Sequence, residues 1–196
     1  MRISKLNLSN VTLVCVDGSK NSKEAKKVFD RVRESISFYD AIFKDDITSI
    51  IDYNDYIINY LHADIKTDFC MIIQADGFPI NLDAWDDLFL KYDYIGAPWY
   101  SQPWPLEKTV GNGGFSIRSK KMLQESSELA YDKSSGTPED VFLCRMKDQE
   151  LKSRGIVFAP HDVAYRFSVE DMYYKGQFGF HGKNTINLNA QVGIFK

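Results

Sequence analysis

The 196-residue sequence predicts one α/β domain over residues 1–196, with a mostly parallel central sheet flanked by helices. Apolar runs typical of buried strands alternate with amphipathic helical segments along the chain. Two of these runs end directly on a carboxylate, at Asp17 and at Asp76. Ligands of such sheets collect at the carboxyl ends of strands, so the sequence predicts a binding site at that edge.

The first half of the chain supplies the clearest elements. A continuous β-branched run, VTLVCV, predicts a buried strand over 11–16, and apolar residues at helical spacing predict a surface helix over 22–36. A short strand over 41–43, a second amphipathic helix over 54–65 and a third strand over 68–75 follow. The alternation of the two element types favours parallel pairing of these strands.

Shorter elements are predicted in the second half. They are a short helix after Asn81 or Asp83, a strand over 92–99, a Gly-rich turn, strand and helix over 111–123, and strands over 155–160 and 163–168. A further helix is expected to open at Thr137, with that threonine as its cap and Pro138 in its first turn.

Composition narrows the classes of function. The formal charge is −3, from 24 basic and 27 acidic residues without a basic block, which argues against a nucleic-acid groove. The cysteines are odd in number and lie in apolar surroundings, which is typical of buried thiols in a reducing compartment. The start lacks a signal-peptide core and no apolar run approaches the roughly 20 residues of a membrane span, so we expect a cytoplasmic protein.

The stretch IIQADGF, residues 72–78, places a carboxylate at the end of a strand with glycine next to it. An unpaired buried carboxylate is costly, so Asp76 is expected at the mouth of the strand. There it offers an open oxygen ligand to a divalent cation that bridges to a diphosphate. The alternative is a turn in which Gly77 supplies a positive φ.

The stretch GNGGFSIRSKK, residues 111–121, combines glycines with basic residues. Gly113 and Gly114 beside Asn112 allow the backbone to approach a ligand closely, and Arg118 follows within reach of an anion. The alternative is a tight turn before a helix with solvated basic residues.

Glu139 and Asp140 are neighbouring acids, and either is a candidate to accept a proton from a hydroxyl group. The alternative for Asp140 is a capping box in which its carboxylate reaches back to Thr137.

His181 lies between aromatics and glycines in FGFHG, a segment suited to bring an imidazole to a metal; the alternative is a hydrogen-bonded packing residue. Trp99, Tyr100 and Trp104 are candidates for a stacking wall against a sugar ring, or for a seal at the edge of the core.

Taken in order, VCVDGS, IIQADGF, YDYIGAPW, VGNGGFSIRSKK, PEDV and FGFHG resemble a family of glycosyltransferase-like domains related to the GT-A nucleotide-sugar glycosyltransferases. The likeness runs from about Val11 to Gly182. The resemblance implies a GT-A-like, Rossmann-like fold.

The resemblance also implies roles for residues. Contacts with the donor nucleotide sugar are implied for Val16, Asp17, Ser19, Gln74, Asp76, Gly77, Asn112, Gly113, Gly114 and Arg118. Asp76 matches the last acid of the Asp-x-Asp motif that binds Mn²⁺ or Mg²⁺, and His181 matches a further metal ligand. Gln74 stands where the first acid usually does, and an amide is a poorer ligand for a hard cation.

The function that the resemblance implies is transfer of a sugar from a nucleoside diphosphate sugar, with UDP the expected nucleotide, to a glycan or other hydroxyl acceptor. Asp140, with Glu139 as the alternative, would be the catalytic base of an inverting reaction. Gln74 favours a different class, a nucleotide- or glycan-binding module without turnover. A hydrolase that acts through Asp76 and Asp140 is a third possibility.

Overall fold

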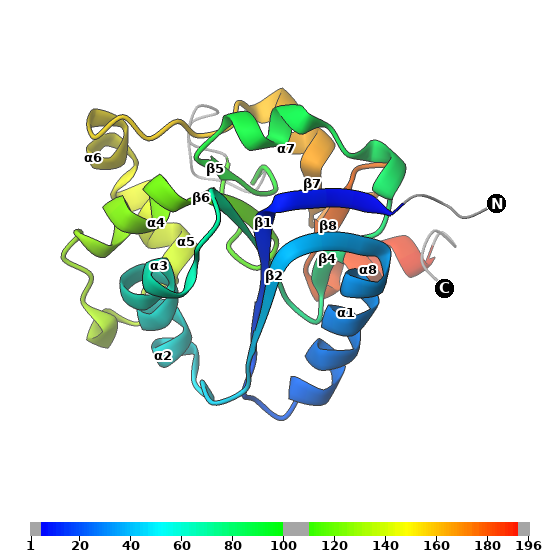
Figure 1. Cartoon of the computed structure of the whole chain (residues 1–196), viewed down its shortest axis with the longest axis horizontal. Coiled ribbons are helices and arrows are strands. Elements are labelled where there is room, and N and C mark those ends of the chain that lie inside the picture. The colour runs from blue at the N-terminus through cyan, green and yellow to red at the C-terminus, as the bar shows by residue number, and fades with distance from the viewer. Residues whose placement is uncertain (1–4, 100–109, 192–196) are drawn as a thin grey trace.

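The computed structural model describes residues 5–99 and 110–191, which fold into a five-stranded sheet, a three-stranded sheet and flanking helices (Figure 1). The strands are β1 (Leu6–Val16), β2 (Ile36–Lys44), β3 (Phe69–Ile73), β4 (Gly77–Pro79), β5 (Tyr94–Ile95), β6 (Ser116–Ser119), β7 (Ser168–Glu170) and β8 (Gly179–His181). The α-helices are α1 (Ser22–Ser35), α2 (Ile50–Asp55), α3 (Leu61–Asp64), α4 (Lys120–Ser127), α5 (Glu139–Val141), α6 (Asp148–Ser153), α7 (His161–Phe167) and α8 (Lys183–Gln191).

Shorter helical turns connect these elements. The π-helical turns η1 (Tyr56–Tyr60) and η6 (Phe142–Met146) continue α2 and α5. The 3₁₀ turns are η2 (Leu82–Ala84), η3 (Asp87–Lys91) and η5 (Lys133–Ser135).

The large sheet has the strand order β2-β1-β3-β6-β5 and is mixed, so the prediction of a mostly parallel sheet is wrong in its second half. Strand β1 runs parallel to β2 and β3, whereas β6 runs antiparallel to both β3 and β5. The reason lies in the connections. Strand β6 follows β5 through a segment without a helix among its described residues, so the chain turns at the carboxyl edge and runs back.

Helices cover both faces of the large sheet, with α1 on one side and α2, α3 and α4 on the other (Figure 1). Side chains of β1 alternate accordingly. Leu13 and Cys15 join the core that includes Phe29 of α1, whereas Val14 and Val16 join the core beneath α2 and η1. Burial on both faces explains why this strand is a continuous apolar run.

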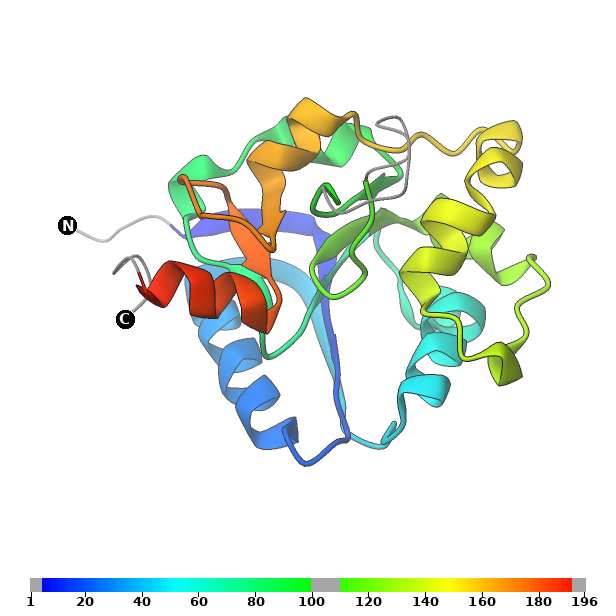
Figure 2. The same ribbon diagram turned by 180° about the vertical axis from the view of Figure 1, so that it is seen from behind.

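The small sheet, in the order β4-β8-β7, joins segments that are far apart in the chain. Strand β4 begins at Gly77, which pairs with His181 at the end of β8. The backbone N–H of Gly182 also donates to the carbonyl of Asp76 at 2.8 Å. Helix α8 then lies beside this sheet, as seen from behind in Figure 2. The C-terminal part of the described chain is thereby placed against the turn that follows β3.

The sequence prediction is wrong for 163–168, which it assigned to a strand. These residues lie mostly in α7, and only Ser168 belongs to β7. Val163, Tyr165 and Phe167 alternate as in a strand, but the residues that are buried are Val163, Ala164 and Phe167, at helical spacing. The stretch 155–160 forms one isolated bridge, between Phe158 and Tyr94, instead of a strand.

Two predicted helix starts are also displaced. The helix expected from residue 54 begins at Ile50, because the Ser49 hydroxyl accepts the N–H of Asp52 at 3.1 Å and caps it. The helix expected to be capped by Thr137 begins at Glu139, with Pro138 in the cap position. Asn81 precedes η2 without a side-chain cap.

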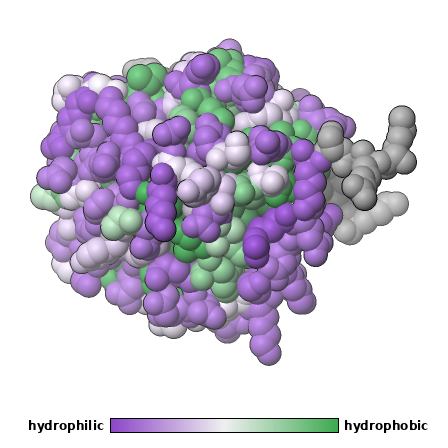
Figure 3. All heavy atoms as spheres, viewed as in Figure 1, coloured by the Kyte–Doolittle hydropathy of each residue, from purple (hydrophilic) through white to green (hydrophobic). Residues whose placement is uncertain are grey.

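Cys15, Cys70 and Cys144 are buried free thiols, as predicted. Within the described ranges no helix combines the length and apolar character needed to cross a membrane. Polar side chains dominate the face shown in Figure 3, where apolar side chains gather over the middle of that face.

Candidate functional site

A pocket of about 560 Å³ opens at the carboxyl edge of β1 and β3. Half of the residues predicted to bind a donor line it, and they come from two separate strand ends: Val16, Asp17, Ser19, Gln74 and Asp76. The remaining lining comes from the N-terminus of α1, from α2 and the segment before it, from the turn after β3 and from α8: Asn21, Glu24, Ile47, Thr48, Ser49, Ile50, Tyr53, Ala75, Lys183 and Ile186. Parallel β1 and β3 thus place both carboxylates predicted from the sequence in one hollow.

The first wall of the pocket is the turn after β1. The N–H of Asp17 donates to the Lys44 carbonyl at 2.9 Å, and the N–H of Ser19 donates to Oδ1 of Asp17 at 2.9 Å. A Cβ atom on Gly18 would lie 2.4 Å from the carbonyl oxygen of Asp45, so glycine is required here by the close approach of two chain segments.

The second wall is a tight turn in which Gln74 and Gly77 exchange backbone hydrogen bonds of 2.8 and 3.2 Å, with Ala75 and Asp76 at its tip. The turn predicted as the alternative for this segment is therefore present, and Asp76 still faces the pocket. Within the described residues, no hydrogen bond or ion pair is formed by the Asp76 carboxylate. Its oxygens are free to meet a ligand.

Gly77 does not have the positive φ that the turn interpretation assigned to it. A Cβ atom on Gly77 would instead lie 2.4 Å from Cδ2 of His181. Glycine at this position makes room for the imidazole ring that strand β8 places across the ladder.

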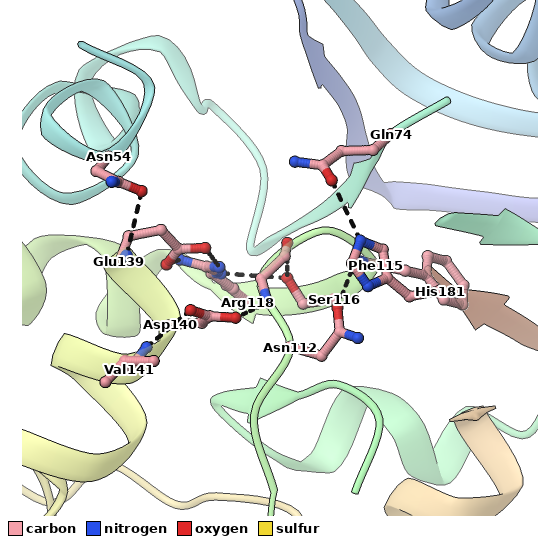
Figure 4. A network of polar contacts seen from close by, with 11 residues as sticks. Asn54, Gln74, Asn112, Phe115, Ser116, Arg118, Glu139, Asp140, Val141 and His181 are labelled. Carbon is pink, nitrogen blue, oxygen red and sulfur yellow. Dashed lines mark hydrogen bonds and ion pairs between the residues drawn. The ribbon is translucent and has the colours of Figure 1, made fainter. Parts of the chain in front are cut away.

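His181 is held from both sides by oxygen atoms. Its Nδ1 lies 2.9 Å from Oε1 of Glu170, and its Nε2 lies 3.2 Å from Oε1 of Gln74 (Figure 4). Burial opposes protonation of the ring, but the hydrogen bond to Glu170 and the charges of Glu170, Asp76 and Asp140 raise the pKa of His181 above its ordinary value. Asp76 and Asp140 are thus both close enough to act on this ring.

Gln74 and Asp76 offer oxygen ligands from the wall of the pocket, whereas His181 does not line the pocket and its Nε2 lies against the Gln74 amide oxygen. In many metal sites a carboxylate holds one ring nitrogen of a histidine while the other nitrogen faces the metal, and Glu170 holds Nδ1 of His181 in this way. Across residues 5–99 and 110–191 no cluster of three or more His, Cys, Asp or Glu residues is present. A cation here would complete its shell with the Gln74 amide oxygen, water and ligand oxygens.

Glu139 and Arg118 form a buried ion pair. The guanidinium donates to both carboxylate oxygens at 2.8 Å, and the two side chains are 1% and 3% exposed. Burial disfavours the charge of Arg118, yet the Glu139 carboxylate raises the pKa of Arg118 well above its ordinary value. Because these two groups bind one another through both oxygens and both terminal nitrogens, the charged ends of Arg118 and Glu139 are already paired, and neither residue lines the pocket.

Asp140 is only partly buried and lies beside this ion pair. Its Oδ2 accepts the N–H of Gly113 at 3.0 Å, and its Oδ1 accepts the N–H of Val141 at 2.8 Å (Figure 4). The capping-box interpretation is wrong, because the backbone N–H of Thr137 donates to the Ser135 hydroxyl at 3.1 Å and not to the Asp140 carboxylate.

The Gly-rich segment lies behind the pocket and does not line it. Gly113 and Gly114 are buried, and Asn112 is 1% exposed with φ of 68°. Oδ1 of Asn112 accepts the N–H of Phe115 at 3.2 Å, while its Nδ2 has no hydrogen-bond partner among the described residues. The predicted role of these residues as the wall of a sugar pocket stays a prediction.

Lys120 and Lys121, which follow this segment, donate to backbone carbonyls of Ile65 and Gly155. Lys120 is half-buried and Lys121 is exposed, as the alternative interpretation has it, and neither lines the pocket. Trp99 packs against Gly111, and the guanidinium of Arg145 stacks 4.5 Å from its ring centroid. Tyr100 and Trp104 lie outside the described residues.

The sequence analysis did not predict several residues at the site, among them Tyr53, Glu170 and Lys183. Tyr53 lines the pocket because α2 begins early, and the capping pattern Ser49-x-x-Asp52 would have indicated that start. Glu170 and Lys183 are brought in by the small sheet and α8, and no local pattern marks either of them.

Together these features define a mixed α/β protein with a ligand pocket at the carboxyl edge of its sheet, in which carboxylates outnumber cations. Residues 36–181 match the profile of a family described as proteins of unknown function (DUF5672), and the chain belongs to this family. No curated protein sequence matches the chain.

Proposed function

We propose that this protein is a GT-A-like glycosyltransferase that moves a sugar from a nucleoside diphosphate sugar, expected to be a UDP-sugar, to an acceptor hydroxyl. The observation that carries the proposal is the free carboxylate of Asp76 in a pocket shared with Asp17 and Ser19. These are the positions at which the family resemblance requires contacts with the diphosphate and the nucleoside.

Charge supports a cation-assisted donor site. The pocket is lined by the carboxylates of Asp17, Glu24 and Asp76 but by one described cationic side chain, Lys183. A diphosphate is strongly anionic, so its approach to this lining requires a positive charge between the two. A Mn²⁺ or Mg²⁺ ion held by Asp76 and His181, with the amide of Gln74, would supply it and offset the charge on the leaving diphosphate.

Asp140 is proposed as the base. Its carboxylate would take the proton of the acceptor hydroxyl as that oxygen bonds to the anomeric carbon, and the bond from this carbon to the diphosphate oxygen would break on the opposite side. The configuration at the anomeric carbon is thereby inverted. The hydrogen bonds from Gly113 and Val141 hold the carboxylate in one orientation for this step.

A binding module without turnover is the second candidate, and one observation favours it. Gln74 occupies the position of the first acid of the Asp-x-Asp motif, and its amide oxygen lies against His181. The site therefore has a neutral amide where the motif has a carboxylate. Such a module would bind a nucleotide or glycan in the same pocket and release no product.

Release of nucleoside diphosphate from a panel of nucleotide sugars, with and without glycan acceptors, tests the proposal directly. Binding without release indicates the module. The site is tested by calorimetric titration with UDP and Mn²⁺, in which Asp76→Asn should abolish binding. The control is Asp83→Asn, which changes an exposed carboxylate of η2 outside the pocket and should leave binding intact. Equal binding by the two variants would refute the role of Asp76.

A further inference from the structure

A closed ring of polar contacts surrounds the Gly113 backbone (Figure 4). Arg118 binds Glu139 through both terminal nitrogens, and its Nε donates to the Ser116 hydroxyl at 3.3 Å. That hydroxyl donates to the carbonyl of Gly113 at 3.1 Å, and the N–H of Gly113 donates to Asp140. Asp140 follows Glu139 directly in the chain, which closes the ring.

The ring leaves no free space at Gly113. A Cβ atom there would lie 1.6 Å from Oε1 of Glu139 and 3.1 Å from an Arg118 nitrogen. The start of α5 is also fixed from outside the ring, because the N–H of Glu139 donates to Oδ1 of Asn54 at 3.2 Å. The ion pair therefore determines where the backbone of 113 and the backbone of 139–140 lie relative to each other.

We infer that Arg118 and Glu139 are positioning residues for Asp140, and that their ion pair sets the place of the candidate base through Gly113. The inference rests on the proposed function, since it assigns a catalytic task to two residues that do not line the pocket. It replaces the two roles that the family resemblance implied for them, contact with phosphate for Arg118 and proton transfer for Glu139.

An ion pair that only stabilises the core would behave differently. Removing one partner of a buried pair is strongly destabilising, but replacing both by apolar residues of similar volume is often neutral. The double variant Arg118→Met with Glu139→Leu therefore separates stability from positioning. The double variant leaves no unpaired charge in the core, but it lacks the hydrogen bonds of Arg118 and Glu139 that are inferred to place Gly113 and Asp140.

The experiment compares wild type, Glu139→Leu, the double variant, and Asp148→Asn as a control that alters another buried carboxylate, paired with Lys152 at 3.3 Å. Melting temperature, turnover and donor KM are measured for each, together with amide hydrogen exchange at Gly113. A misplacement of about 1 Å in a catalytic group lowers rate about 100-fold. The double variant should melt near wild type, lose about 100-fold in kcat with donor KM unchanged, and exchange the Gly113 amide faster.

Recovery of turnover together with stability in the double variant would overturn the positioning role. A Gly113 amide that stays as protected as in wild type would also overturn it, and this result needs no activity. If wild type transfers no sugar from any donor, the proposed function fails, while the exchange measurement still decides whether the pair places Gly113. Should the double variant not fold, Glu139→Gln, which keeps the shape of the side chain, is measured for the same loss of kcat and of amide protection.

Discussion

The substitution Gly114→Ala tests the proposed donor site through a single methyl group. Its Cβ atom would lie 2.1 Å from Nε2 of His181 and 2.5 Å from Oε1 of Gln74, whereas ordinary contacts begin near 3.4 Å. The imidazole must therefore retreat by about 1.3 Å and the amide by about 0.9 Å. The ring cannot retreat freely, because Glu170 holds its other nitrogen at 2.9 Å.

The expected magnitude follows from this geometry. Overpacking a buried site costs about 1–3 kcal/mol, and displacing groups that orient a metal ligand lowers metal affinity about 10- to 100-fold. Gly114→Ala should therefore weaken binding of Mn²⁺ with UDP by about that factor. At about 2–4 °C per kcal/mol for a chain of this size, the melting temperature should fall by about 2–12 °C.

The assay is calorimetric titration of UDP with Mn²⁺, beside a thermal melt followed by circular dichroism. Gly136→Ala is the matched control, because Gly136 has φ of 67° and no atom within 4 Å of a Cβ placed there. It should cost about 1–2 kcal/mol through backbone strain alone and leave binding unchanged. If both variants bind as wild type does, the Gln74–His181 pair has no part in the donor site.

Further predictions concern the base, the imidazole and the thiols. Asp140→Asn should lower turnover about 10²- to 10⁴-fold with little change in donor affinity; a lower melting temperature at normal turnover would instead make this residue purely structural. His181→Ala should weaken the affinity for Mn²⁺. An unchanged metal titration would show that His181 is a packing residue and not a metal ligand. Burial, and next the charge of Asp17, raise the pKa of Cys15 to about 12, and burial raises the pKa of Cys70 to about 12. The thiols of Cys15, Cys70 and Cys144 should therefore not react with a disulfide reagent at pH 8 in the native protein, and they should react after unfolding in urea. Rapid reaction of the folded protein would contradict their burial.

The ends of β1 and β3 could be predicted because the signal is local. An apolar run that stops at Asp17 or shortly before Asp76 marks both the strand and its exit, and parallel pairing brings the exits together. Helix α7 could not be predicted in this way. Its apolar residues satisfy a period of two as well as helical spacing, and the choice depends on which of them the core buries.

The partners of the site residues are not local. Arg118 and Glu139 are 21 residues apart in the chain. From the sequence alone each looks like an ordinary surface charge, and only the fold shows that they are buried as a pair. The glycines of 113–114 predicted a close approach of the backbone to a ligand, which stays a prediction; the groups that lie close to them are the side chains of Glu139 and His181. Sequence spacing predicted that space was needed and did not indicate what would fill it.

The pairing of Gly77 with His181 also determines when the candidate site is completed during synthesis. A nascent chain that ends before β8 already carries β1, β3 and Asp76, but it lacks the imidazole, its Glu170 neighbour held in the small sheet, and Lys183. The groups around the pocket are therefore synthesised in two parts, and His181 and Lys183 reach their places only after β8 has paired with β4.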